Sequence, residues 1–299
     1  MTRPPATVSV DVDPVDLHLA GYGYRGLPPD ARVYQQAIPR LLGIMQRTGI
    51  RATFFIVGRD VAANAGAIAA IAAAGHEIAS HSQTHPMAFG RLPETRMRAE
   101  LADSKAALEA AGTGEVIGFR APNFDVSARV VGALAEAGYR YDASGYPTPL
   151  LLPVRTVLAF KSRDPRAVFT LRAWPFTLER LPFDWRVGER SVREYPITVT
   201  PFLRLPFYHT MRYYLPLWRF QARLGWFARH GEALSYPLHA VDALGLDEDG
   251  VDPRLARHPG MKWGLERKLD MLEASLEAIA ERFEPVPFRE RLARDVARG

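Results

Sequence analysis

Short apolar runs rich in β-branched and aromatic residues alternate along this chain with longer segments whose apolar residues recur at helical spacing. Such alternation is typical of βα units around a largely parallel sheet. The pattern predicts strands at 7–10, 52–57, 76–79, 116–119, 139–141 and 234–238, and helices at 31–48, 61–74, 93–111 and 127–137. One apolar face is predicted for a last long helix, and it is formed by Leu265, Leu269, Leu272, Leu276, Ile279 and Phe283.

The regular alternation stops at about residues 146–232, a segment rich in proline and aromatic residues. We interpret it as an insertion on a single catalytic domain that spans residues 1–299. Within it, a helix starting at Leu217 would place Phe220, Leu224 and Phe227 on one face, with Arg219 and Arg223 beside that face. The predicted fold class is α/β with a proline-rich, aromatic insertion.

The amino-acid composition excludes several classes of protein and several kinds of metal site. The chain has 299 residues, of which 47% are hydrophobic and 24% are charged, and this excludes disorder, collagen and coiled coil. It contains no cysteine, so disulfides, thiolate nucleophiles and cysteine-ligated metals are excluded. Any metal must therefore be held by histidine, aspartate or glutamate.

The formal net charge of +5 is small for a chain of this length, and no nucleic-acid recognition motif is present. We therefore expect no nucleic-acid partner. The first residues lead directly into a strand without an apolar leader, which predicts a cytoplasmic protein. No apolar run reaches the roughly 18 to 20 residues of a membrane span, so membrane contact would be peripheral, at the inner face.

Polar side chains follow five of the predicted strands. In a parallel sheet the carboxyl ends of the strands meet at one rim, where reactive groups gather. The residues in question are Asp11, Asp13, His81, His85, Arg120, Asp142 and His239.

His81 and His85 are four residues apart and could approach one divalent ion from the same side. With Asp13 they would form a two-histidine, one-carboxylate site that leaves positions open for water and substrate. Alternatively, the two histidines are exposed surface residues without a functional role, and the Asp-Val-Asp-Pro sequence only forms the turn that ends a strand.

The other rim residues suggest acid–base chemistry. Asp11 lies on the same side of its strand as Asp13, and with Arg120 to orient it, it could take a proton from water. His239 would donate a proton to the leaving group, unless it is a buried histidine whose ring only makes hydrogen bonds within the core. Asp142 could hold Arg120 or His239 in place, or it could be a helix cap or turn residue.

Six segments in order resemble the motifs of the polysaccharide deacetylases, also called the NodB homology domain or carbohydrate esterase family 4. The resemblance covers about residues 7–145 and resumes near 233. The segments are Ser9 to Asp13, Ala52 to Phe55, His76 to His85, Gly118 to Pro122, Tyr139 to Asp142, and Leu238-His239. Six motifs in the same order are far more specific than any one alone.

This resemblance implies a distorted or incomplete (β/α) barrel and one divalent metal ion, usually zinc in vitro, with manganese, cobalt or nickel as other candidates. It implies Asp11 as general base and Asp13, His81 and His85 as metal ligands. It likewise implies that Arg120 orients Asp11 and that His239 is the general acid. The family commonly has adjacent aspartates where Val12 separates them here, and a tyrosine where this chain has Asn123. A backbone N–H at Asn123 would still serve the oxyanion.

The implied activity is removal of an N-acetyl or N-formyl group from an amino sugar. The enzyme would hydrolyse the carbon–nitrogen bond of that linear amide. The spaced aspartates look closest to the deformylases and deacetylases of undecaprenyl-phosphate-linked sugars, which act in cell-envelope glycan or lipid A modification. Arg219, Arg223, Trp218 and Phe220 would then contact lipid or an anionic membrane surface. The alternatives are a deacetylase of soluble or polymeric amino sugars, a purine-catabolic amidohydrolase, or a non-catalytic sugar or lipid-phosphate binder.

Overall fold

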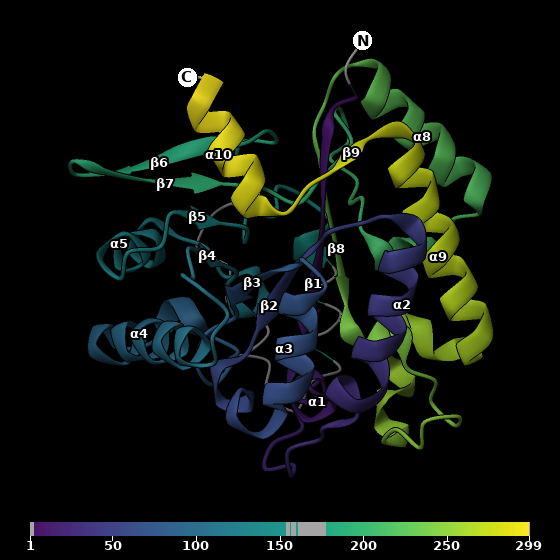
Figure 1. The fold of residues 1–299 in the computed structure, drawn as a ribbon, viewed down its shortest axis with the longest axis horizontal. Coiled ribbons are helices and arrows are strands. Elements are labelled where there is room, and N and C mark those ends of the chain that lie inside the picture. The colour runs from purple at the N-terminus through teal and green to yellow at the C-terminus, as the bar shows by residue number, and fades with distance from the viewer. Residues whose placement is uncertain (1–2, 154–155, 157–159, 161–177, 299) are drawn as a thin grey trace.

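The computed structural model describes residues 3–153, 156, 160 and 178–298, and its centre is a nine-stranded sheet (Figure 1). Along the sheet the strands follow the order β6-β7-β5-β4-β3-β2-β1-β8, and the short β9 pairs with β1. All described pairs are parallel except β6 with β7. The parallel strands are β1 (Pro5–Val12), β2 (Thr53–Ile56), β3 (Glu77–Ser80), β4 (Gly118–Phe119), β5 (Tyr141–Asp142), β7 (Arg190–Glu194), β8 (Leu234–His239) and β9 (Glu284–Pro285).

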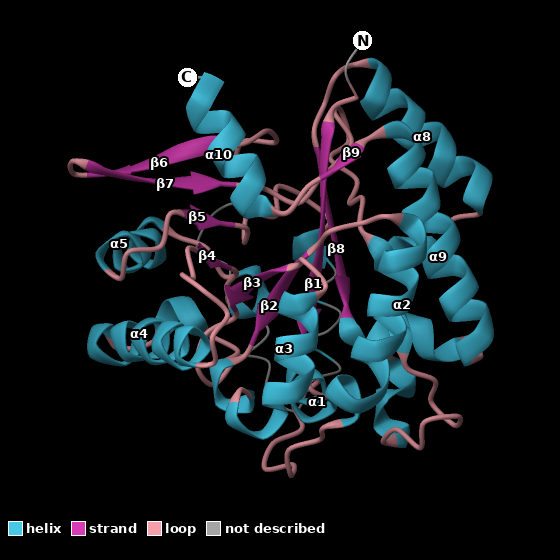
Figure 2. Ribbon diagram, in the orientation of Figure 1, coloured by secondary structure: helices cyan, strands magenta, loops and turns pink. Residues whose placement is uncertain are grey.

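Helices surround this sheet, as Figure 2 shows in cyan. In chain order they are α1 (Val15–Gly21), α2 (Ile38–Thr48), α3 (Ala65–Ala73), α4 (Glu94–Ala110), α5 (Ala128–Glu136), α8 (Leu217–Arg229), α9 (Leu265–Arg282) and α10 (Phe288–Arg298). The predicted α/β class and incomplete barrel are confirmed as an unclosed, mostly parallel sheet covered by helices.

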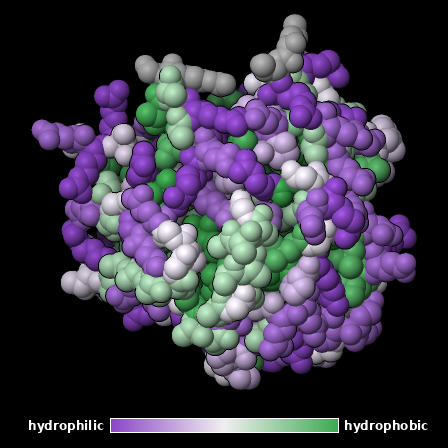
Figure 3. All heavy atoms as spheres, in the orientation of Figure 1, coloured by the Kyte–Doolittle hydropathy of each residue, from purple (hydrophilic) through white to green (hydrophobic). Residues whose placement is uncertain are grey.

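Local sequence explains the central elements. All residues of β1 from Ala6 to Val12 are buried, which is typical of a parallel strand with both faces covered. The helix α2 buries Ile38, Leu41, Ile44 and Met45, and it ends where Gly49 takes up a left-handed φ of 67°. The alanine-rich α3 buries only Ile68 and Ile71, so its small side chains form the pale apolar patch over α3 in Figure 3.

The structure adds a hairpin that the sequence pattern did not predict. Strands β6 (Phe183–Val187) and β7 are antiparallel, and β7 continues the sheet beside β5, with Asp142 opposite Glu194. The predicted insertion therefore contributes two strands to the same sheet, although part of it lies outside the described residues. The C-terminal helix α10 lies beside this hairpin (Figure 1), with an Arg193–Asp295 ion pair of 3.7 Å.

The helix α8 packs its predicted apolar face inward. Phe220 is 2% exposed and stacks on Phe207 at a ring distance of 5.0 Å, while Leu224 and Phe227 are also buried. The hypothesis that Phe220 contacts lipid is therefore wrong, because the core already covers its ring. Trp218 and Arg219 lie on the outer side of the same helix and are exposed.

Candidate active site

Five of the seven predicted rim residues line one cavity of about 360 Å³ at the carboxyl ends of the strands; they are Asp11, Asp13, His81, His85 and His239. β1 delivers Asp11 and Asp13, β3 leads into His81 and His85, and β8 ends at His239. Because β1 pairs with β8 so that Asp11 lies opposite His239, two groups distant in sequence are placed at the same level of the rim. Arg120 directly follows β4, and its side chain contacts Asp11.

Asp13, His81 and His85 form a compact buried cluster. Asp13 Oδ1 lies 3.3 Å from His81 Nε2 and 3.4 Å from His85 Nε2, and one candidate ligand atom from each residue lies within 4.8 Å of the others. His81 Nδ1 lies 2.7 Å from the Arg120 carbonyl oxygen, which can only accept, so Nδ1 carries a proton and Nε2 faces Asp13. Asp13 Oδ1 and His85 Nδ1 are buried and have no hydrogen-bond partner among the described residues. This donor set fits a divalent metal ion.

The protonation states of Asp13 and His85 suit the same role. Burial of Asp13 favours its neutral form, but the neighbouring charges of His85 and His81 outweigh this and hold the Asp13 pKa below its ordinary value. Burial lowers the pKa of His85 to about 4. At neutral pH the cluster therefore presents a carboxylate and a neutral His85 imidazole. Burial acts to lower the pKa of His81, but the charge of Asp13 outweighs it and raises that pKa, so a metal ion would have to displace the proton that Asp13 favours on His81.

A tight loop rather than a helical turn brings the two histidines together. Ser82 and His85 both have left-handed backbones, with φ of 65° and 55°, and the Ser82 hydroxyl oxygen accepts a hydrogen bond of 3.1 Å from the His85 N–H. The rings of His81 and His85 consequently lie 4.8 Å apart.

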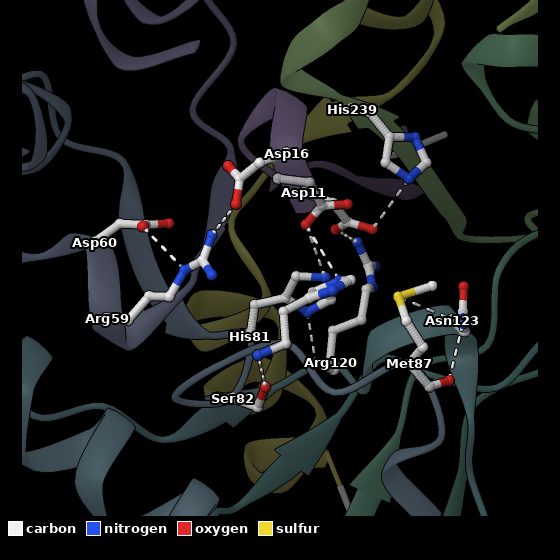
Figure 4. Close-up of polar contacts among 12 residues, drawn as sticks. Asp11, Asp16, Arg59, Asp60, His81, Ser82, Met87, Arg120, Asn123 and His239 are labelled. Atoms are coloured by element: carbon white, nitrogen blue, oxygen red, sulfur yellow. Dashed lines mark hydrogen bonds and ion pairs between the residues drawn. The ribbon is translucent and has the colours of Figure 1, made fainter. Parts of the chain in front are cut away.

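Asp11 and His239 face each other beside this cluster (Figure 4). Arg120 donates from Nη1 to Asp11 Oδ1 at 2.5 Å and from Nε to the Ala143 carbonyl at 2.9 Å, and its guanidinium lies 4.1 Å from the Phe55 ring centroid. Arg120 is completely buried. The other oxygen of Asp11, Oδ2, lies 3.8 Å from His239 Nε2. Arg120 therefore fixes one oxygen of Asp11 and leaves the second facing His239.

Asp142 does not make the contact that would hold Arg120 or His239. Its Oδ1 accepts from the Ser144 hydroxyl at 2.5 Å, and no hydrogen bond among the described residues joins it to either partner. Asp142 is neither a helix cap nor a turn residue, because it is the buried last residue of β5 and lies opposite Glu194 of β7. Instead, Asp242 Oδ2 accepts from the His239 backbone N–H at 2.9 Å, and its Oδ1 accepts from Tyr213 at 2.7 Å. Sequence reasoning missed Asp242, although it follows His239 by only three residues.

Asn123 lines the cavity. Its backbone is left-handed with φ of 56°, and its Nδ2 donates to the Met87 carbonyl at 2.9 Å. The role of its backbone N–H toward an oxyanion stays a prediction.

Several cavity residues were not singled out from the sequence, among them His18, Tyr22, Tyr208 and His258. His18, on the short helix α1, places its ring 5.4 Å from that of His239 and 5.1 Å from that of His258. Burial lowers the pKa of His18 to about 4 and that of His258 well below its ordinary value. Two neutral imidazoles and two tyrosines therefore line the cavity beside the Asp13-His81-His85 cluster.

Fold and site together define an α/β protein with an unclosed parallel sheet and a buried Asp-His-His cluster at its rim. Residues 28–141 match the family model for polysaccharide deacetylase, which supports a polysaccharide deacetylase domain in this chain.

Solved structures share the fold over nearly the whole chain. A candidate polysaccharide deacetylase from Mycobacterium smegmatis has 20% identity and a TM-score of 0.63, covering 98% of this chain and 90% of its own. A second candidate, from Pseudomonas aeruginosa PAO1, has 17% identity and a TM-score of 0.59, with coverage of 97% and 89%. An allantoinase is also similar, with 17% identity, a TM-score of 0.60 and the same coverage. At these identities the likeness concerns the fold.

Proposed function

We propose that this protein is a metal-dependent hydrolase that removes an N-acetyl or N-formyl group from an amino sugar. The observation that carries the proposal is the convergence of the Asp13-His81-His85 cluster and the Asp11–Arg120 pair on one cavity with His239. The polysaccharide deacetylase match over residues 28–141 supports the same reaction class.

The ion held by Asp13, His81 and His85 would polarise the acyl carbonyl and acidify a water molecule. Arg120 holds Oδ1 of Asp11 and so orients the carboxylate, which leaves Oδ2 free to accept the proton of the attacking water. The Asn123 backbone N–H would meet the developing negative charge on the acyl oxygen. His239, held by Asp242 at its backbone, would give a proton from Nε2 to the departing amine.

Point variants separate metal binding from proton transfer. His81→Ala and His85→Ala should each lose bound zinc, measured by metal analysis of the purified protein, together with deacylase activity. Asp11→Asn should retain zinc but lose at least roughly a hundredfold in turnover, the usual scale for a general base. His230→Ala, on an exposed histidine outside the cavity, serves as the control. Full zinc occupancy in the His81→Ala, His85→Ala double variant would contradict the site.

We further propose that the sugar is linked to a polyisoprenyl phosphate and that α8 with the loop before it rests on an anionic membrane surface. Three large apolar side chains are exposed there: Phe202 is 94% exposed, Leu203 69% and Trp218 64%. Arg219 and Arg223 line an adjoining groove of about 430 Å³ with Trp218 and Phe202. Aromatic rings beside arginines suit the boundary between lipid headgroups and acyl chains.

The segment from Tyr195 to Gly231 contains no acidic residue, which adds to the attraction for anionic lipid. No described helix combines the length and apolar character needed to cross a bilayer, so contact would be peripheral. We propose that the protein acts at the inner face of the membrane on a substrate presented there.

Vesicle binding tests the membrane proposal. We expect co-sedimentation with phosphatidylglycerol-containing vesicles that weakens as salt rises, because exposed charges are screened. Arg219→Glu combined with Arg223→Glu should reduce binding, whereas Arg190→Glu on the distant hairpin should not. Indifference of the metal-loaded protein to vesicles, with equal hydrolysis of soluble and lipid-linked amino sugars, would contradict this proposal and leave the deacylase chemistry intact.

A further inference from the structure

Arg257 is the one arginine among the described residues that line the candidate active-site cavity. Its side chain is exposed, and no ion pair joins it to a carboxylate in the described part of the chain. Its neighbour Arg254, by contrast, is bound to Asp252 at 2.5 Å. A guanidinium without a counter-ion at the wall of a reaction cavity is available to a ligand.

The backbone that carries Arg257 is fixed. Arg257 ends the 3₁₀ segment Pro253–Arg257, which is capped where the Asp252 side chain accepts from the Arg254 N–H at 2.9 Å. Leu255 is fully buried two residues before it, and His258, directly after it, is buried at 4% exposure. The backbone of Arg257 is therefore held in place, while its guanidinium remains free to contact a ligand. Binding a ligand would then cost little backbone conformational entropy.

The immediate surroundings add hydrogen-bonding capacity without adding negative charge. Arg257 lies over the Tyr24 ring at 5.6 Å, and Tyr22 and Tyr208 line the same cavity. Burial raises the pKa of Tyr22 to about 12, so its hydroxyl remains a donor at neutral pH. The carboxylates that line the cavity are Asp11, which Arg120 neutralises, and Asp13, which belongs to the metal cluster.

We propose that Arg257 binds an anionic substituent of the amino sugar, a phosphate ester or a carboxylate, and so sets the substrate class of this enzyme. The planar guanidinium offers paired N–H donors that match either group. This inference rests on the proposed function, because it concerns the sugar whose acyl group lies at the metal cluster. It assigns the anion to the Arg257 side of the cavity and the amide to the Asp11 side.

Binding to a non-reacting protein tests the proposal. In the zinc-loaded Asp11→Asn variant, calorimetric titration should show that N-acetylglucosamine 1-phosphate binds at least about tenfold tighter than N-acetylglucosamine, a typical effect of one charge-assisted contact. N-Acetylmuramic acid, which carries a carboxylate instead, shows which of the two anions is preferred. Raising the salt concentration should reduce the preference for the anionic sugars.

Adding Arg257→Gln should abolish the preference for the anionic sugars while leaving the affinity for N-acetylglucosamine unchanged. Arg254→Gln is the matched control, because Arg254 also lies over Tyr24, at 5.0 Å, but does not line the cavity. An anionic sugar that binds no better than the neutral one, or a preference that survives Arg257→Gln, overturns the proposal.

Acyl release by the wild-type enzyme is measured separately. Release of acetate without a preference for anionic sugars would remove the Arg257 proposal and keep the deacylase function. A preference that depends on Arg257, without acyl release from any amino sugar, would do the reverse.

Discussion

At the residue scale, Asp142 and Glu194 form a buried carboxyl pair where β5 meets β7. Glu194 accepts hydrogen bonds from the Gly145 N–H at 2.8 Å and from Trp185 Nε1 at 2.9 Å. Burial raises the pKa of Asp142 to about 6 and that of Glu194 well above its ordinary value, and for Glu194 the charge of Asp142 acts in the same direction. Two such groups cannot both ionise without cost, so the native state retains protons that the unfolded chain has released.

This pair predicts a pH dependence of stability. In the unfolded chain both carboxyls titrate near pH 4. Between about pH 4 and pH 6 the native state therefore binds more protons, and the free energy of unfolding falls as the pH rises through that window. Glu194→Gln should remove roughly 1 kcal/mol or more of this fall, because each unit of pKa shift corresponds to about 1.4 kcal/mol.

Urea denaturation at pH 4, 5, 6 and 7 measures the effect, with the exposed Glu277→Gln as the control. Parallel pH profiles for wild type and Glu194→Gln would show that the pair does not titrate in this range.

At the element scale, we expect substitutions on the buried and exposed faces of α8 to differ in their effect on the free energy of unfolding. Leu224 is fully buried, so Leu224→Ala should lower the free energy of unfolding by about 2–5 kcal/mol. Trp218 is mostly exposed, so Trp218→Ala should change it by no more than about 0.5 kcal/mol. Both values come from denaturant unfolding of the metal-loaded protein. A large loss for Trp218→Ala would mean that its ring is covered in solution.

Periodicity was sufficient for elements that contact the core along one face or both. The pattern placed β1, β2, β3, α4, α5 and α9 to within a few residues, because buried strands give short apolar runs and buried helix faces give helical spacing. The predicted helix at 31–48 is a π-helical segment, Val33–Ala37, followed by α2. The hairpin β6–β7 was missed even though Phe183, Trp185 and Val187 alternate with polar residues and Gly188 turns the chain with φ of 58°. Its flanking prolines hid that signal.

The same limit explains the candidate site. Residues that directly follow strands were predictable because parallel strands end at one rim. The helix α1 with His18, and the 3₁₀ segment before His258, are too short to carry a period. Their place in the cavity depends on tertiary packing. Likewise, the partner of Asp142 could not be foreseen without knowing that β7 pairs with β5.

At the scale of the whole molecule, metal binding and folding should be linked. An ion that binds the native cluster but not the unfolded chain stabilises by about 2.7 kcal/mol at a hundredfold excess over its dissociation constant. We therefore expect zinc to raise the thermal midpoint of unfolding and a chelator to lower it. His85→Ala should unfold at the same temperature with and without zinc, whereas His230→Ala should respond like the wild type. A midpoint indifferent to zinc in the wild type would contradict the cluster.

At His85 the backbone conformation that best suits stability and the side chain that suits metal binding favour different residues. Residues other than glycine are uncommon at φ near +55°, although histidine, asparagine and aspartate adopt it more often than the rest, so His85 keeps this backbone at some cost in local stability. Selection for heat resistance alone would favour glycine at this position, and would thereby discard one of the three candidate metal ligands. Laboratory evolution of a more robust enzyme from this scaffold must therefore hold position 85 constant and seek its gains elsewhere.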